Sequence, residues 1–254
     1  MRFFVWVYIL HVIAYTCPMI LPTHPGKAPT VVHQDIEYTR HMVRTNRVDA
    51  DTDLVGELVE VCGNFLQDND TVCIAESVVA ITQKRAYKIA DIVPGFTART
   101  LARFVTKTPA GIGLGMPETM QLAVNEVGIC RLWFAAAVAA ITRTLGRPGD
   151  FYRLAGERAR GIDGPTSGTL PPYNEYATLI PNNPRKVAQD IEAQIGKQVG
   201  KTVEVVLVDA NDIGVNILGA RDKAQKQLAT ALSLDNPMGQ GHEQTPVMIA
   251  RKIS

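Results

Sequence analysis

Cysteine is scarce in this chain, and it forms no recognisable metal or redox motif. The four cysteines stand at positions 17, 62, 73 and 130, with no CxxC pair and no histidine at zinc-ligand spacing. A zinc site of the common kinds and a CxxC redox centre are therefore excluded. Cys62 and Cys73 lie in apolar runs, where a thiol behaves as a small core residue. A reduced, cytoplasmic compartment is the simpler interpretation.

An excess of charge of one sign is missing as well. The 254 residues include 26 lysines and arginines and 25 aspartates and glutamates, which gives a formal net charge of +1. This balance provides no electrostatic basis for binding nucleic acid. The hydrophobic fraction of 46% and the charged fraction of 20% are typical of a globular chain with a sizeable core, as one large domain or two small ones.

The common nucleotide-binding fingerprints are also absent. A glycine-rich run, GIGLG at residues 111–115, directly precedes the helix expected to start at Pro117, and free amides at a helix start can bind an anion. The run does not match the dinucleotide fingerprint, and no Gly-Lys-Thr or Gly-Lys-Ser follows it, so it is not a Walker loop. We interpret it as a flexible loop.

The first 29 residues differ from the rest. Residues 1–21 are almost wholly apolar, with Arg2 as their one charge. A signal peptide or a membrane anchor has this composition, and a buried strand is a third alternative. Residues 22–29, PTHPGKAP, have the composition of a linker. We expect an N-terminal extension with its linker at residues 1–29, whose membrane contact stays open, and one domain at residues 30–254.

Hydrophobic periodicity predicts strands interleaved with helices. Residues 129–141 are apolar on all sides, so we expect them to be buried, as a strand or a helix. The interleaved order indicates an α/β or mixed α+β fold. The other predicted elements are a β-rich stretch at 30–48, strands at 71–75, 203–208 and 246–251, and helices at 53–66, 96–105, 117–127, 185–195 and 222–232.

Two aspartates stand where a charge is costly unless it is used. Asp209 ends the apolar run at residues 203–208, and Asp163 ends the short run Gly161-Ile162-Asp163. Hard cations such as Mg²⁺ take oxygen ligands, and two carboxylates from different segments are a common minimal set. The alternative is that Asp209 starts an ordinary turn that Asp212 caps.

Five short runs, taken in order over about residues 40–254, resemble the gamma-glutamyl ligases that add glutamate to the deazaflavin coenzyme F-420. That family carries T-S-K-x-x-S-K, A-G-I-D-x-S-N, L-L-P-x-D-P, a strand ending in D-T, and M-G-x-G-x-x-x-x-P. The last match is the most specific, because an apolar strand follows it directly, and the first is the weakest. The corresponding runs are AESVVAI at 75–81, RGIDGPT at 160–166, TLIPNNP at 178–184, VDA at 208–210 and MGQGHEQTP at 238–246.

The resemblance implies the family's ligase fold and a GTP-dependent reaction, in which a substrate carboxylate becomes an acyl phosphate and the amine of L-glutamate then displaces phosphate. It implies Mg²⁺ or Mn²⁺ on Asp163 and Asp209, with Asp212 as a further candidate ligand, an F-420-like carboxylate substrate, and a homodimer. The residues that it places along the nucleotide are Thr45, Asn46, Arg47, Val48, Glu76, Ser77, Thr166, Gly239, Gln240, Gly241, His242 and Glu243.

The departures from the family pattern are serious. Ser77 and Ile81 stand where the first motif has lysines, and neither supplies the positive charge that lysine offers a phosphate. Arg85 is the candidate substitute, and Lys84 is the other. Ala210 replaces the threonine of the metal site, so its hydroxyl is lost unless Asp212 or Asn211 compensates. Residues 143–160 are an insertion relative to the family.

Two classes of function remain open. The first is an active amide ligase that couples nucleotide cleavage to the joining of a carboxylate and an amine. The second is a catalytically inactive homologue that keeps the fold as a binding or scaffold protein. A membrane-tethered binding protein that uses the apolar N-terminus is a third, weaker interpretation.

Overall fold

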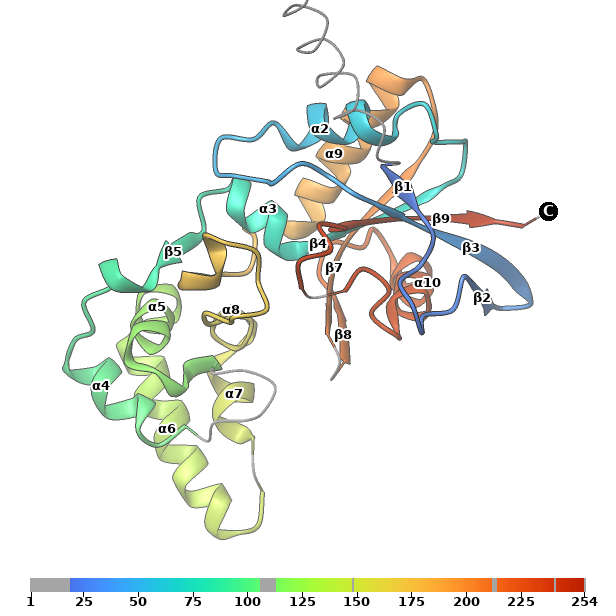
Figure 1. Ribbon diagram of the computed structural model, residues 1–254. Helices are drawn as coiled ribbons and strands as arrows, with labels where there is room; N and C mark the ends of the chain where they lie inside the picture. Colours follow the sequence, from blue (N-terminus) through green and yellow to red (C-terminus); the bar gives the residue numbers. More distant parts are fainter. Residues whose placement is uncertain (1–18, 106–112, 148, 212–213, 240, 254) are drawn as a thin grey trace, which may run out of the picture.

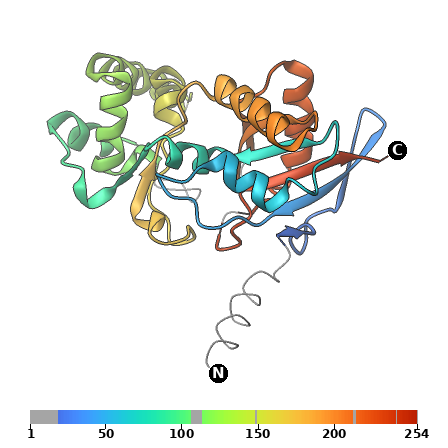
Figure 2. The ribbon, with the colours of Figure 1, turned by 90° about the horizontal axis from the view of Figure 1, so that it is seen from above.

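The molecule has a sheet unit, built around one mixed β-sheet, and a helical unit that lies beside it (Figures 1 and 2). The computed structural model describes residues 19–105, 113–147, 149–211, 214–239 and 241–253. Within these residues, seven strands form the sheet, in the order β1-β3-β9-β4-β7-β8, with β2 also paired to β3. The strands are β1 (Ile20–Leu21), β2 (Thr30–His33), β3 (Ile36–Val43), β4 (Thr71–Ala75), β7 (Glu204–Asn211), β8 (Gly214–Ile217) and β9 (Val247–Lys252).

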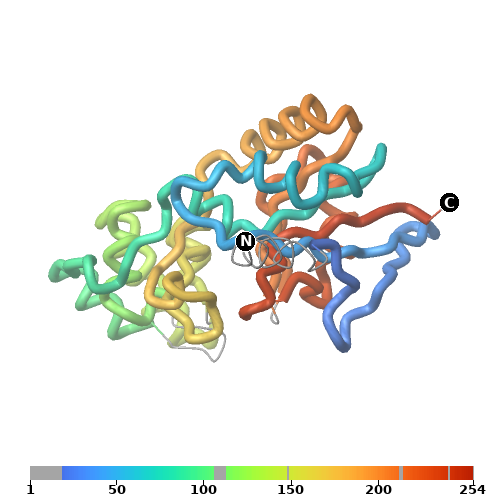
Figure 3. The backbone as a smooth tube through the Cα atoms, turned by 45° about the horizontal axis from the view of Figure 1, so that its top comes forward, coloured from blue at the N-terminus to red at the C-terminus, as the bar shows by residue number. Residues whose placement is uncertain are grey.

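The centre of the sheet combines both strand directions. β4 and β7 are parallel, with Ala75 opposite Val208, whereas β9 is antiparallel to both β3 and β4. The last strand of the chain therefore lies between two earlier ones, and the tube of Figure 3 shows the red C-terminal strand beside the blue and teal ones.

Helices cover both faces of the sheet. α2 (Leu54–Cys62) and α9 (Pro184–Val199) pack on one face, and α10 (Lys223–Ser233) packs on the other (Figure 1). Because side chains alternate along a strand, Val72 and Ile74 of β4 join the core under α2 and α9, while Cys73 joins the core under α10. Both faces of the central strands are thus buried.

The helical unit has its own core. It contains the buried side chains of Leu101, Met120, Leu132 and Ile162. A two-stranded sheet joins the helical unit to the rest of the chain, with Ala86 opposite Thr178. The elements here are α3 (Glu76–Thr82), β5 (Ala86–Lys88), η1 (Ile89–Asp91), α4 (Phe96–Ala102), η2 (Gly113–Gly115), α5 (Pro117–Val127), α6 (Ile129–Thr144), α7 (Asp150–Ala155), α8 (Glu157–Arg160), η3 (Tyr173–Glu175) and β6 (Tyr176–Thr178).

The predicted mixed fold is confirmed, one local prediction is wrong, and the turn considered as an alternative at Asp209 is not observed. Residues 129–141 form part of α6, but only Leu132 and Ala135 of that helix are buried, since no element in the described part of the chain covers its outer side. Asp209 does not start a turn. It lies inside β7 opposite Asn216, because β8 pairs back onto β7 and extends that strand to Asn211.

The N-terminal prediction is only partly within reach, because residues 1–18 lie outside the described part of the chain. The boundary at residue 30 stays a prediction, although residues 19–29 contact the domain. Ile20 pairs with Val43, and the carbonyl of Ala28 accepts a hydrogen bond of 3.0 Å from Nε of Arg40. Among the described residues, no single helix has the length and hydropathy needed to cross a membrane.

Candidate functional site

The ends of three strands and the start of a fourth meet at one edge of the sheet. Val43, near the end of β3, and Ile74, near the end of β4, are both opposite Val247, the first residue of β9. Ala75 is opposite Val208 on the parallel strand β7. Glu76 and Asp209 each come one residue later, so two carboxylates follow the same register pair. The strand register therefore explains why these distant residues share one site.

Three carboxyl groups influence one another at this edge. Glu76 is 9% exposed, and its Oε2 atom has no hydrogen-bond partner among the residues that the structure describes. Burial raises the pKa of Glu76 well above its usual value, and the charges of Asp209 and Asp163 raise it further. An unsatisfied buried carboxyl oxygen is costly, so Glu76 needs a proton, a cation or a hydrogen-bond donor from elsewhere.

Asp163 reaches the same site from another part of the chain. Its backbone is fixed beside Thr178 of β6, because the two residues exchange N–H···O bonds of 2.9 Å each. The residue is accessible to solvent, yet the protein packed around its carboxyl raises the pKa of Asp163 to about 6, with the charge of Asp209 as the second cause. The predicted approach of Asp163 to Asp209 is thus consistent with this electrostatic coupling.

The carboxyl of Asp209 is influenced by the charge of one arginine. Burial raises the pKa of its carboxyl, and the charge of Arg160 opposes that shift. Arg160 is the last residue of α8, directly before the run Gly161-Ile162-Asp163. Sequence reasoning assigned no role to Arg160, and its position immediately before the Asp163 run was the available signal.

The segment before β9 is held against two of the strand ends. The N–H of Thr45 donates to the carbonyl of Gln244 at 3.1 Å, and the N–H of Ala75 donates to the carbonyl of Pro246 at 2.8 Å. The predicted nucleotide-contacting residues Thr45 and Glu76 therefore lie beside the same segment. Its glycine turn, residues 238–246, follows the α10 layer and approaches the site from that side of the sheet.

The glycine turn already contains an anion of its own. The N–H of Gly241 donates to Oε2 of Glu243 at 2.7 Å, and a Cβ placed on Gly241 would lie 3.0 Å from that oxygen. Gly239 has a φ of +79°, which favours glycine. His242 is exposed, and Gln240 lies outside the described residues. The turn can therefore present an amide to a carboxylate, which is the chemistry needed for any anionic oxygen.

The other predicted nucleotide contacts are less well placed. Val48 is buried in the core, and the guanidinium of Arg47 pairs with Asp49 at 3.0 Å. Asn46 donates its N–H to Oε1 of Glu57 at 2.6 Å. Thr166 is exposed, with its hydroxyl 3.4 Å from the N–H of Gly168. Of the stretch 45–48, Thr45 is the member that the hydrogen bonds tie to the glycine turn.

The proposed substitute for the missing lysines is engaged elsewhere. Arg85 is buried and donates from Nε to the carbonyl of Ile180 at 2.7 Å and from Nη2 to Glu126 at 2.8 Å. The structure therefore gives no support to Arg85 as a free phosphate ligand. Ser77 is exposed on the first turn of α3, whereas Ile81 is 7% exposed and belongs to the core. The alternative cation, Lys84, pairs with Asp51 at 3.0 Å.

The carboxyl groups suit a hard divalent cation by their chemistry. No three histidine, cysteine or acidic side chains within the described part of the chain are arranged to hold a metal ion by themselves. That does not conflict with a magnesium site, because Mg²⁺ is usually held by one or two carboxylates together with waters and substrate phosphates. Asp163 and Asp209 supply such a pair, and Glu76 adds an oxygen without a partner. The third candidate ligand, Asp212, lies outside the described residues.

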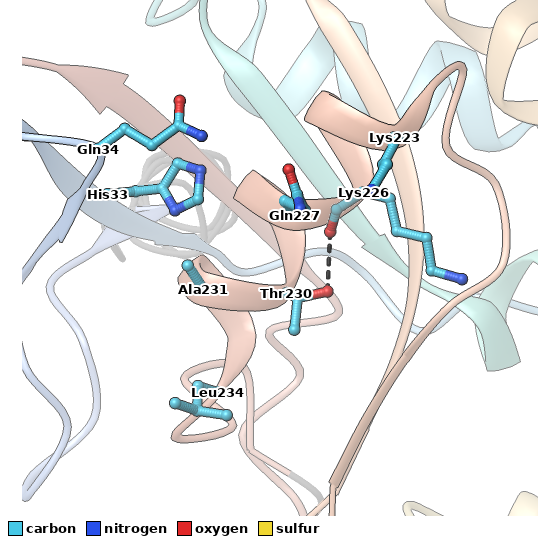
Figure 4. A pocket seen from close by; sticks show the side chains of 8 residues that line it. All are labelled: His33, Gln34, Lys223, Lys226, Gln227, Thr230, Ala231 and Leu234. Carbon is cyan, nitrogen blue, oxygen red and sulfur yellow. Dashed lines mark hydrogen bonds between the residues drawn. The ribbon is translucent and has the colours of Figure 1, made fainter.

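Shape alone would point to another part of the surface. A groove of about 570 Å³ lies between the turn after β2 and α10 (Figure 4). It contains none of the predicted site residues and no carboxylate, so we place the candidate site by its chemistry. The groove is lined by His33, Gln34, Lys223, Lys226, Gln227, Thr230, Ala231 and Leu234.

Comparison with known proteins identifies the family of the chain. No curated protein matches the chain. The family model described as F420-0:Gamma-glutamyl ligase matches residues 42–216, more than half of the chain. The matched range includes Thr45, Glu76, Asp163 and Asp209, but it ends before the glycine turn. The chain therefore belongs to the F420-0:gamma-glutamyl ligase family.

Proposed function

We propose that the chain is an amide ligase that uses a nucleotide and a divalent cation to join an amine to a carboxylate. Membership of the family supports a gamma-glutamyl ligase-like function in general. The observation that carries the finer proposal is the group of coupled carboxyls at the sheet edge, in which Glu76 keeps a buried oxygen without a partner. A protein that needed only the fold would lose this costly arrangement without penalty.

Asp163 and Asp209 are the residues that would hold Mg²⁺ or Mn²⁺, and Asp212 stays a predicted further ligand. The cation would supply positive charge next to the nucleotide phosphates. Glu76 would complete the oxygen environment, because its free Oε2 lies in the electrostatic reach of both aspartates. The positive charge of the cation would also lower the raised pKa values of these carboxyls, which stabilises their ionised forms.

GTP is the nucleotide that we propose, with its phosphates between the glycine turn and α8. The N–H of Gly241 is one donor, and the guanidinium of Arg160 is the cation in place of the missing lysines. Ser77 and Thr45, which follow the ends of β4 and β3, would be further contacts of the nucleotide. For Gly241 to donate to a phosphate, the carboxylate of Glu243 must leave its present hydrogen bond.

The proposed substrates are an F-420-like small molecule with a free carboxylate, and L-glutamate. The carboxylate oxygen attacks the terminal phosphate of GTP, which yields an acyl phosphate and GDP. The amine nitrogen of glutamate then bonds to the acyl carbon as phosphate leaves, and the nitrogen loses a proton. This chemistry depends on positioning and on neutralisation of phosphate charge more than on a protein nucleophile.

The test is turnover. Release of GDP and phosphate should require the carboxylate acceptor, glutamate and Mg²⁺ or Mn²⁺ together, and Asp209→Asn should lower the rate at least about 100-fold, as expected for loss of a charge that stabilises the transition state. Asp190→Asn is the matched control, since Asp190 is exposed on α9. Turnover that survives Asp209→Asn at the control rate would contradict the proposal.

The second candidate function is a catalytically inactive homologue. The specific observation in its favour is that Ile81 occupies a lysine position inside the core, while Arg85 is held by Glu126. Such a protein would bind the nucleotide with its cation and show no release of GDP with any acceptor. The homodimer and the cytoplasmic location stay predictions.

A further inference from the structure

Exposed apolar side chains are concentrated on one part of the molecule. Among the described residues, twelve large hydrophobic side chains are exposed, and eight of them lie on or next to α4 and α6. Large exposed apolar patches on soluble proteins mark interaction sites. The eight are Val93, Phe96, Phe104, Ile129, Trp133, Phe134, Ile141 and Leu145.

The outer side of α6 carries a continuous apolar stripe. Cys130, Phe134, Ala137 and Ile141 follow the spacing i, i+4, i+7, i+11, which places them on one side of a helix, and all four are exposed. The opposite side is anchored in the core of the helical unit through Leu132. In Figure 1, α6 runs along the outside of this unit, away from the sheet.

The stripe continues toward α4. The indole N–H of Trp133 donates to the hydroxyl of Thr97 at 3.4 Å, so the start of α4 lies beside α6. There Phe96 is 81% exposed and Trp133 is 40% exposed. We define the α4–α6 face as Phe96, Cys130, Trp133, Phe134, Ala137 and Ile141.

The charges around the α4–α6 face are positive. Residues 96–160 contain nine lysines and arginines and four aspartates and glutamates, although the whole chain has a net charge of only +1. Arg99 and Arg103 are exposed and follow Phe96 by three and seven residues, which places them on its side of α4, and neither α4 nor α6 contains an acidic residue. Two of the four acidic residues are already paired: Glu126 binds Arg85 and Arg158, and Asp150 binds two neighbouring arginines.

We propose that the α4–α6 face binds the surface of an anionic lipid bilayer, with α6 lying in the plane of the interface. A helical face that combines aromatic and aliphatic side chains with neighbouring arginines, here Arg99 and Arg103, is typical of interfacial binding, and anionic lipids attract such basic segments. α5 and α6 together have the hydropathy of a membrane span, but they are bent by 115°, and α5 is held in the core by Met120. The pair therefore suits contact with a membrane surface and not a crossing.

A second copy of the chain fits this face less well. Two copies would bring Arg99 and Arg103 of both chains together, with no acidic residue of α4 or α6 to pair them. α6 has 16 residues, about 24 Å of helix, and one short helix face is small beside the roughly 1,200 Å² of a stable interface. Charge complementarity therefore favours the anionic bilayer.

The experiment measures co-sedimentation of the full-length chain with vesicles. Vesicles of phosphatidylcholine with phosphatidylglycerol should bind the chain, and vesicles of phosphatidylcholine alone should bind it much less. Phe134→Ser combined with Ile141→Ser should lower the partition coefficient at least about tenfold, because two large side chains no longer enter the interface. Arg99→Glu should lower it as well, through charge alone, because Arg99 is exposed on the side of α4 that carries Phe96.

The matched control is Val32→Ser combined with Leu234→Ser, two similarly exposed apolar residues on the sheet unit, and it should bind like the wild type. A second readout uses Trp133 in a Trp6→Phe background, since the chain has two tryptophans. Its fluorescence should shift to the blue with anionic vesicles and be quenched by brominated lipids.

Three results would overturn the proposal. The first is the absence of binding to anionic vesicles. The second is equal binding of the wild type and the Phe134/Ile141 variant, which would assign the contact to another segment such as residues 1–21. The third is a wild-type dimer that the same variant dissociates, with unchanged lipid binding, which would identify a second copy as the partner. Melting temperatures of all variants should match the wild type, because the replaced side chains are exposed.

Discussion

The two units of this molecule treat polar and apolar groups in opposite ways. The sheet unit buries charge: Glu76 is 9% exposed at the end of a central strand, among two other carboxyls. The helical unit exposes apolar groups, with Phe134 at 61% and Ile141 at 64%. Each arrangement costs free energy in an isolated chain, and each is expected where a bound partner removes the cost. The difference is what we expect if, as proposed, the sheet edge binds a small charged ligand and the helices bind a broad anionic surface.

The largest loss of stability is expected when a charge is placed in the apolar core of the sheet unit. Ile81→Lys should destabilise the fold by about 3–5 kcal/mol, because it buries an unpaired ammonium in the core under α2 and α9. Ser77→Lys restores the other family lysine at an exposed position and should leave stability within about 0.5 kcal/mol. Chemical denaturation measures both, and equal stability of the two variants would contradict the placement of Ile81.

The two sides of α6 offer a comparison within one helix. Leu132→Ala should cost about 2–5 kcal/mol, because Leu132 is fully buried in the core of the helical unit. Phe134→Ala, two residues further on, should change stability by less than about 0.5 kcal/mol in the absence of lipid. Thermal unfolding of both variants distinguishes them. A large loss with Phe134→Ala would show that another segment covers the α4–α6 face.

Arg85 and Arg160 should differ in role: we expect Arg85 to stabilise the fold and Arg160 to contribute to the proposed nucleotide site. Arg85→Ala should destabilise the fold by about 2 kcal/mol, because Glu126 keeps only its exposed partner Arg158. Arg160→Ala should have little effect on stability and should weaken GTP binding about tenfold, as expected for one charge-assisted contact. Calorimetric titration with GTP and Mn²⁺ measures the second effect. If Arg85→Ala weakens binding and Arg160→Ala does not, the assignment is reversed.

The smallest expected effect is on pH dependence. The pKa of Asp163 is raised from 3.8 to about 6, so the folded state binds more protons than the unfolded state in this window. Stability should therefore fall as the pH rises from about 4 to about 6. Asp163→Asn should flatten this part of the profile, and Mg²⁺ should oppose the fall. Asp235, whose pKa is lowered chiefly by its hydrogen bond to Arg40, acts in the opposite sense as the pH falls below its unfolded value.

Local pattern was enough to predict the elements that their own sequence determines. The strand at 71–75 and the helix at 117–127 have the predicted bounds, because apolar runs and a proline at a helix start are local signals. Whether α6 is covered depends on neighbours that its own sequence does not specify. The length of β7 likewise depends on β8, which pairs with it through Asn211 and Gly214.

Residue type alone was enough to propose the acidic part of the candidate site, which stays a prediction. Asp163 and Asp209 were identified because an acidic residue at the end of an apolar run is costly, and their electrostatic coupling agrees with that reasoning. The role given to Arg85 stays a prediction without support from the structure, and its partner Glu126 could not be foreseen because it is 41 residues away in the sequence. Arg160 was missed because its position directly before the Asp163 run does not by itself show that its charge acts on Asp209, which is 49 residues further along the chain.

Cation-dependent binding of GTP at the proposed site is tested by calorimetric titration of Mn²⁺ with GTP. The proteins compared are the wild type, Asp209→Asn and the control Asp190→Asn. We expect the wild type and the control to bind GTP only when Mn²⁺ is present. Asp209→Asn should lose at least about tenfold in affinity for GTP, because a charged ligand is removed from a partly buried site. Equal affinity of all three proteins, or GTP binding that does not depend on the cation, would contradict it.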